Sequence, residues 1–142
     1  MEKEFVPYEI ALELKELGFD EPCFATYRTH AVGSKKPFEY DLDYHTKVEM
    51  SSNVIPINSE YTEESKWISA PTYSQAFKWF RENYKLLHSI HGIHSIEPFE
   101  LDCQILNISN GSSYHLKYSG DDYEQAELEC LKKLIQIVKE QK

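Results

Sequence analysis

Two amphipathic helical patterns in the second half of the chain limit the folds that it can adopt. The first opens at Thr72, which forms the capping box T-x-x-Q with Gln75. The second begins at Asp122 and ends near Lys139, with acidic residues in its first turns and lysines in its last. That order matches the helix dipole. In both patterns apolar side chains recur on one face, so each helix must pack that face against another layer.

Strand patterns lie between and before these helices. Residues 86–96 and 99–108 are expected to be strands, and Asn110-Gly111 is a hairpin signal because both residues tolerate a positive φ. Residues 114–118 alternate apolar and polar side chains and form the return strand. The remaining expected elements are a first helix over 7–18, which Gly18 ends, and strands at 23–29 and 38–44.

These elements predict an α+β fold, in which three helices pack against one mostly antiparallel sheet of about four or five strands. A chain of 142 residues predicts a single domain over residues 1–142. Residues 51–66 show no clear periodicity and are expected to form a mobile loop. No apolar run approaches the roughly 20 residues that cross a bilayer, so a membrane partner is not expected.

The charge of the chain bears on its partners. It carries 24 acidic against 15 basic residues, for a formal net charge of −9. Binding to nucleic acid requires clustered Lys and Arg that displace counterions. The densest basic pairs are only Lys35-Lys36 and Lys132-Lys133, so direct nucleic-acid binding is not expected. An acidic surface can meet a basic partner, or it can simply keep the protein soluble.

The three cysteines, Cys23, Cys103 and Cys130, are widely spaced and set among apolar neighbours. We expect them to be reduced, buried side chains of a cytoplasmic protein. The charged amino terminus lacks the basic-then-apolar layout of a signal peptide. Because no Walker loop, GxGxxG, HExxH or EF-hand motif occurs, no cofactor is predicted.

Three histidines recur at intervals of three: His88, His91 and His94. Imidazole is a common metal ligand, and three could complete the open zinc site of a metal-dependent hydrolase. On a strand, however, a step of three alternates faces, so His91 would point away from the other two. Gly92 and the nearby isoleucines disfavour a helix. The metal-dependent hydrolase is therefore the alternative hypothesis, and solvated histidines beside buried isoleucines are the favoured interpretation.

Aromatic residues make up 13% of the chain, and ten of them are tyrosines. Tyrosine is enriched at protein interfaces because its apolar ring carries a polar hydroxyl. A sheet face rich in tyrosine and carboxylate would form a protein-binding platform or a homodimer surface. Ordinary core packing with hydroxyls at the rim is the competing interpretation. The predicted binding surface comprises Tyr40, Tyr44, Tyr114, Tyr118, Asp41 and Asp43.

Three parts of the chain resemble short uncharacterised proteins from mobile elements and phages of gut Bacteroidetes. They are PYEIAL at 7–12 with GFDEPCFA at 18–25, SAPTYSQAFKWFR at 69–81, and YEQAELECL at 123–131. The resemblance implies a cytoplasmic accessory protein of phage or mobile-element origin, and it assigns no catalytic residue. The favoured hypothesis is therefore a non-enzymatic protein-interaction module.

Overall fold

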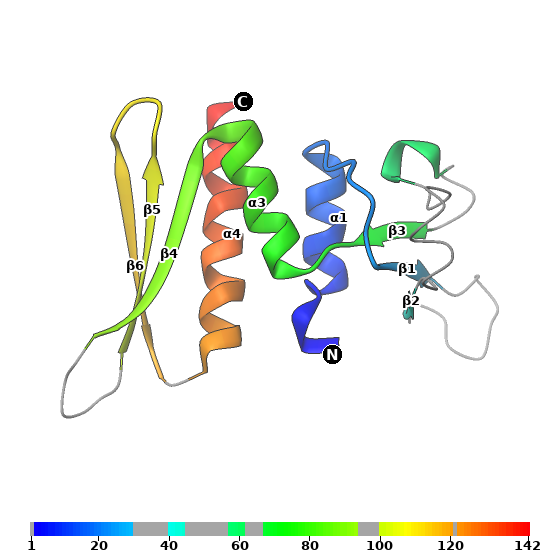
Figure 1. The fold of residues 1–142 in the computed structure, drawn as a ribbon, viewed down its shortest axis with the longest axis horizontal. Coiled ribbons are helices and arrows are strands. Elements are labelled where there is room, and N and C mark those ends of the chain that lie inside the picture. The colour runs from blue at the N-terminus through cyan, green and yellow to red at the C-terminus, as the bar shows by residue number, and fades with distance from the viewer. Residues whose placement is uncertain (1, 30–39, 45–56, 62–66, 94–99, 121) are drawn as a thin grey trace. The chain divides into compact units, whose positions relative to one another are not determined.

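The computed structural model of this chain describes residues 2–29, 40–44, 57–61, 67–93, 100–120 and 122–142 (Figure 1). The chain divides into two compact units, Met1–Thr72 and Tyr73–Lys142, and each is described by itself. The predicted α+β class with three α-helices is confirmed in the described residues. The predicted single sheet is wrong, because six strands form two separate three-stranded antiparallel sheets. The single domain over 1–142 stays a prediction.

Unit 1 is built on a sheet with strand order β2-β1-β3. The central strand β1 (Ala25–Thr29) pairs with β2 (Tyr40–Tyr44) on one side and with β3 (Trp67–Ala70) on the other. Helix α1 (Tyr8–Glu16) contacts β3 and buries its apolar stripe. The predicted end of this helix is confirmed, since Gly18 has a φ of +100° and its N–H donates to the carbonyl of Lys15 at 3.0 Å.

A buried asparagine joins three segments of unit 1. Asn58 begins the short 3-10 helix Asn58–Glu60 and is only 5% exposed. Its Nδ2 donates to the carbonyl oxygen of Phe19 at 2.8 Å, and its Oδ1 accepts from the backbone N–H of Ser69 at 2.9 Å. Within the predicted mobile loop, 51–66, the structure therefore describes an anchored turn at 57–61. The other residues of that loop lie outside the described ones.

Unit 2 has the element order α3-β4-β5-β6-α4. Helix α3 (Tyr73–Tyr84) leads into β4 (Leu86–Ile93), β5 (Glu100–Asn107) and β6 (Ser113–Ser119), which pair in that order, and α4 (Tyr123–Gln141) follows. Both helices lie on the same side of the sheet (Figure 1). This one-sided cover decides which side chains of the sheet are buried.

Two of the local signals that predicted unit 2 are confirmed. The turn residue Gly111 has a φ of +75°, and its N–H donates to the carbonyl of Asn107 at 2.8 Å, which closes the β5–β6 hairpin. Asp122 caps α4 by accepting from the N–H of Gln125 at 3.2 Å. The buried stripe of α4 consists of Ala126, Cys130, Leu131, Leu134, Ile135, Ile137 and Val138.

Strand alternation gives the sheet of unit 2 two different faces. In β5, Leu101, Cys103 and Ile105 are buried on the side of the helices, while the residues between them point the other way. No described helix or strand of unit 2 lies over that second side, which we call the open face. The open face comprises every second residue from Leu87 to Ile93, from Glu100 to Leu106 and from Ser113 to Ser119.

The backbone of Lys85, which links α3 to β4, is strained, and this strain can be tested. Lys85 has a φ of +58°, a left-handed conformation that costs a residue with a Cβ roughly 1–2 kcal/mol. Its Nζ also donates to the carbonyl of Glu82 at 3.1 Å. Lys85→Gly and Lys85→Ala both lose that bond, but only glycine relieves the strain. We expect the glycine variant to be more stable than the alanine variant by about 1 kcal/mol in urea unfolding. Equal stabilities would contradict the left-handed conformation.

Candidate functional site

The predicted tyrosine surface does not lie in one sheet. Tyr44 and Asp43 belong to β2 in unit 1, whereas Tyr114 and Tyr118 belong to β6 in unit 2. The expectation of a shared sheet face is therefore wrong, because the predicted single sheet is in fact two. The binding role of these residues stays a prediction.

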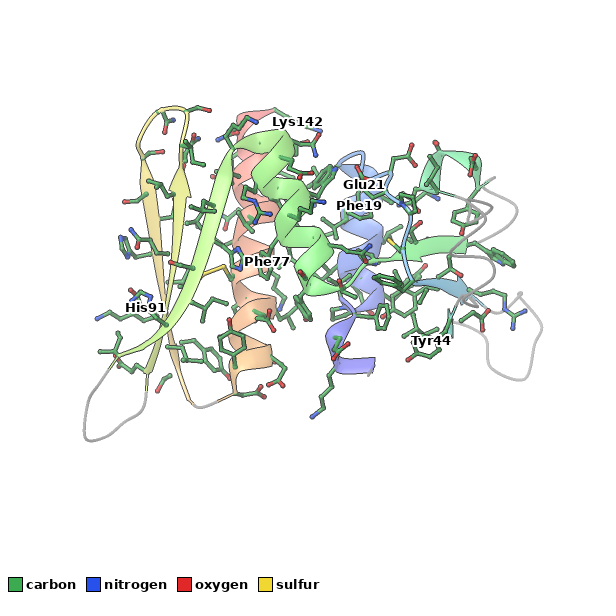
Figure 2. All side chains as sticks on the ribbon, in the orientation of Figure 1. Phe19, Glu21, Tyr44, Phe77, His91 and Lys142 are labelled. Atoms are coloured by element: carbon green, nitrogen blue, oxygen red, sulfur yellow. A yellow bond between two sulfur atoms is a disulfide. The ribbon has the colours of Figure 1, made fainter. Side chains whose placement is uncertain are left out.

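On β2, the described side chains already have partners within unit 1. The ring of Tyr44, labelled in Figure 2, is 46% exposed and packs edge-on against Phe5, with 5.6 Å between ring centroids. The Oδ2 of Asp43 lies 3.6 Å from the Nε of Arg28, and both side chains are half exposed. The side chains of Tyr40 and Asp41 lie outside the described residues. The acid of this strand whose side chain is described, Asp43, is thus paired with a cation.

On β6, the tyrosines face the helices. Tyr114 is opposite Ile105 and Tyr118 is opposite Leu101, both buried positions of β5. The two tyrosines are half-buried, and the Nζ of Lys133 lies 5.8 Å from the centroid of the Tyr114 ring, a cation–π contact. These tyrosines therefore contribute to the packing of unit 2 rather than to its open face.

Two of the periodic histidines, His88 and His91, lie on opposite faces of β4. His88 lies on the helix side and stacks on Phe77 of α3, with ring centroids 3.6 Å apart and planes 11° from parallel. Burial lowers the pKa of His88, and the positive charge of Arg81 lowers it further. His91 lies on the open face, and His94 lies outside the described residues. His88 and His91 therefore do not converge on one point.

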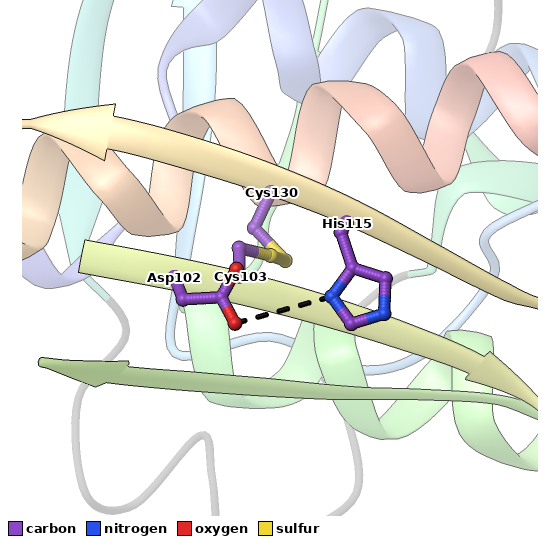
Figure 3. The surroundings of a disulfide bond; sticks show 4 residues. All are labelled: Asp102, Cys103, His115 and Cys130. Carbon is purple, nitrogen blue, oxygen red and sulfur yellow. Dashed lines mark ion pairs between the residues drawn. A yellow bond between two sulfur atoms is a disulfide. The ribbon is translucent and has the colours of Figure 1, made fainter. Parts of the chain in front are cut away.

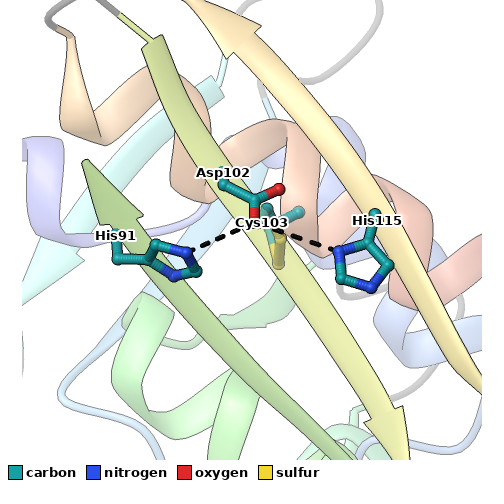
Figure 4. Close-up of polar contacts among 5 residues, drawn as sticks. His91, Asp102, Cys103 and His115 are labelled. Carbon is teal, nitrogen blue, oxygen red and sulfur yellow. Dashed lines mark ion pairs between the residues drawn. A yellow bond between two sulfur atoms is a disulfide. The ribbon is translucent and has the colours of Figure 1, made fainter. Parts of the chain in front are cut away.

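A different cluster forms at the middle of the open face. The Oδ2 of Asp102 lies 3.3 Å from the Nε2 of His91 and 3.9 Å from the Nδ1 of His115. Figure 4 shows the two imidazoles on either side of the carboxylate. The two histidine side chains are 55% and 56% exposed, but that of Asp102 is only 16% exposed. We call this group the His–Asp–His cluster.

The sequence contained a signal for this cluster. Because Asn110-Gly111 sets the register of the hairpin, Asp102 falls opposite Lys117, and His115 falls diagonally beside it on the same face. Pairing of β4 with β5 then adds His91 directly opposite Asp102. As they stand, no three His, Cys, Asp or Glu side chains among the described residues surround a point where a metal ion could sit.

The expectation of three reduced cysteines is wrong for two of them. Cys103 of β5 and Cys130 of α4 form a disulfide, with Cα atoms 6.3 Å apart (Figure 3). Both were expected to be buried, but the sequence did not indicate that the sheet and the last helix bring them together. Cys23 is the free cysteine. Burial, aided by the charge of Glu21, raises its pKa to about 12, so the thiol is protonated and poorly nucleophilic at neutral pH.

Comparisons with protein-family models, curated proteins and solved structures found no match to this chain. None of the helices in the described ranges is long and apolar enough to cross a membrane. The site must therefore be interpreted from its own geometry.

The cysteine pairing can be checked by counting thiols. When the protein is unfolded in guanidinium without a reductant, we expect an alkylating reagent to add to one cysteine, Cys23. After reduction it should add to all three. Intact mass spectrometry measures both numbers, and three additions before reduction would contradict the disulfide.

The environment of His88 predicts a pH effect on stability. Because its pKa is lowered in the folded protein, the unfolded chain binds this proton more readily, and stability is lost as the pH falls below the ordinary value of 6.5. His88→Phe keeps an aromatic ring against Phe77 but cannot titrate. We expect this variant to lose less stability than the parent between pH 7 and pH 5 in urea unfolding. Measurements at pH 8, where His88 is neutral in both states, serve as the control, and identical losses would refute the assignment.

Proposed function

We propose that this protein is a non-enzymatic protein-interaction module, and that unit 2 binds its partner through the open face. The observation that carries this proposal is an apolar patch at one end of that face. Leu87 and Leu106 lie directly opposite each other and are 38% and 36% exposed. Ile108, whose N–H donates to the carbonyl of Lys85 at 2.9 Å, is 56% exposed. We call these three side chains the aliphatic patch.

The aliphatic patch departs from the usual pattern of a one-sided sheet. Antiparallel sheets that are covered on one face normally carry polar side chains on the other. Most of the rest of the open face follows that rule, with Ser89, Gln104 and Lys117 among its residues, and Ile93 is the exception. Neighbouring aliphatic side chains within a polar surround resemble the centre and rim of a protein interface.

The size of the face supports a weak or transient complex. Strands of at most eight residues, spaced about 4.8 Å apart with a rise of about 3.4 Å per residue, give a face of about 400 Å². A stable interface typically buries about 800 Å² on each partner. The open face alone is thus small for a permanent homodimer, and we propose a different protein as the partner.

The charges of the open face do not favour nucleic acid. Its described charged residues are Glu100, Asp102 and Lys117, together with the imidazoles of His91 and His115. A face with two carboxylates beside one lysine lacks the positive stripe that phosphates require. This supports a protein partner over DNA or RNA.

A cytoplasmic location and a phage or mobile-element origin stay part of the proposal, and the resemblance of the three stretches supports both. The Cys103–Cys130 bond argues against the cytoplasm, because reductants there keep most thiols reduced. Alkylation of thiols at the moment of cell lysis, followed by the mass measurement described above, tests the compartment directly.

Site-specific photo-crosslinking in the native cells tests the interaction. We expect a photoreactive amino acid at Leu106 to give a covalent adduct with a second protein. The same reagent at Leu12, a leucine on α1 that is 37% exposed, is the matched control and should give none. Leu87→Asp should abolish the Leu106 adduct without lowering the melting temperature by more than a few degrees, since Leu87 is partly exposed. An adduct with twice the mass of the chain, or no adduct at Leu106, would overturn the proposal.

A further inference from the structure

The His–Asp–His cluster takes one side chain from each strand of the unit 2 sheet. His91 of β4 and Asp102 of β5 are directly opposite, and His115 of β6 is the diagonal neighbour of Asp102. All three point to the open face, away from the helices. Rigid, hydrogen-bonded strands therefore position the three Cα atoms, while the side chains above them have room to turn.

The atoms of the cluster are of the kinds that bind borderline metal ions. Imidazole nitrogen and carboxylate oxygen are common zinc ligands, with bonds of about 2.0–2.2 Å. Two donors on a tetrahedral ion at that bond length are about 3.3–3.5 Å apart. The Nε2 of His91 and the Oδ2 of Asp102 are already 3.3 Å apart. The Nδ1 of His115 is 3.9 Å from the same oxygen, but it lies on the other side of the carboxylate from His91, so both rings must turn before their nitrogens can share one ion.

The half-exposed imidazoles allow this adjustment. At present they flank the carboxylate, so no ion-sized point is surrounded by all three donors. Both histidine side chains are more than half exposed, and rotation about their χ angles moves the ring nitrogens without disturbing the core. Asp102, which is 16% exposed, is the less mobile ligand. To form the site, both rings must rotate until their nitrogens lie on the same side of the Asp102 oxygen.

We propose that His91, Asp102 and His115 bind one divalent transition-metal ion of the zinc class on the open face. The imidazoles give the site its preference for Zn²⁺, Co²⁺ or Ni²⁺ over Mg²⁺ and Ca²⁺, which prefer oxygen ligands. Three protein ligands leave a fourth position of a tetrahedral ion for water or for a side chain of another molecule.

Calorimetric titration of the full chain, purified without a histidine tag and stripped with a chelator, tests this site. With ZnCl₂ we expect about one ion per chain, and with CoCl₂ the visible absorption of four-coordinate cobalt. His91→Gln, Asp102→Asn and His115→Gln should each weaken zinc binding about tenfold or more. MgCl₂ should give no binding heat.

His88→Phe provides the matched control, because it removes a histidine of the same strand from the opposite face. It should leave zinc binding unchanged. The two exposed histidine variants retain the core, so loss of binding in them reports on the site. Absence of zinc binding, full binding by His115→Gln, or loss of binding in His88→Phe would each overturn the proposal. Since zinc titration involves no protein partner, its result is independent of the crosslinking result at Leu106.

Discussion

Alternation of side chains along three short strands is the constraint on which unit 2 depends. Helices α3 and α4 cover one face of the sheet, so successive residues of each strand enter either the core or solvent. On the covered side this places Cys103 against α4 and His88 against Phe77. On the other side it collects His91, Asp102 and His115. A register shift of one residue would exchange the two sets. The register that packs the core therefore also determines which side chains are exposed on the open face.

The features that could be predicted from the sequence are those encoded within one turn or one helix. The Asn110-Gly111 hairpin, the Asp122 cap and the apolar stripe of α4 each depend on residues a few positions apart. The number of sheets depends instead on pairing between distant segments. Trp67–Ala70 was not among the predicted strands, yet it pairs with β1 about 40 residues earlier. No local pattern distinguishes a strand that joins this sheet from one that joins the other.

The candidate site was predictable only in part, for the same reason. Alternation correctly indicated that His91 points away from His88, but the partners of His91 lie on other strands. Asp102 and His115 carry no motif, and they become neighbours only through the register of two strand pairs. The tyrosines show the converse: Tyr114 and Tyr118 alternate as predicted, but only the position of α4 shows that their side is covered. Sequence patterns identify the two faces of a strand, and tertiary packing decides which of them meets solvent.

The disulfide has a consequence for the integrity of the folded chain. It encloses the β5–β6 hairpin and the first turns of α4 in a covalent ring, since its cysteines are 27 positions apart. A single peptide-bond cleavage inside this ring leaves both fragments tethered, with α4 still held beside β5. After a cleavage outside the ring, no disulfide holds the two fragments together. The exposed hairpin tip at Asn110 is therefore a place where backbone damage can occur without dissociation of the fragments.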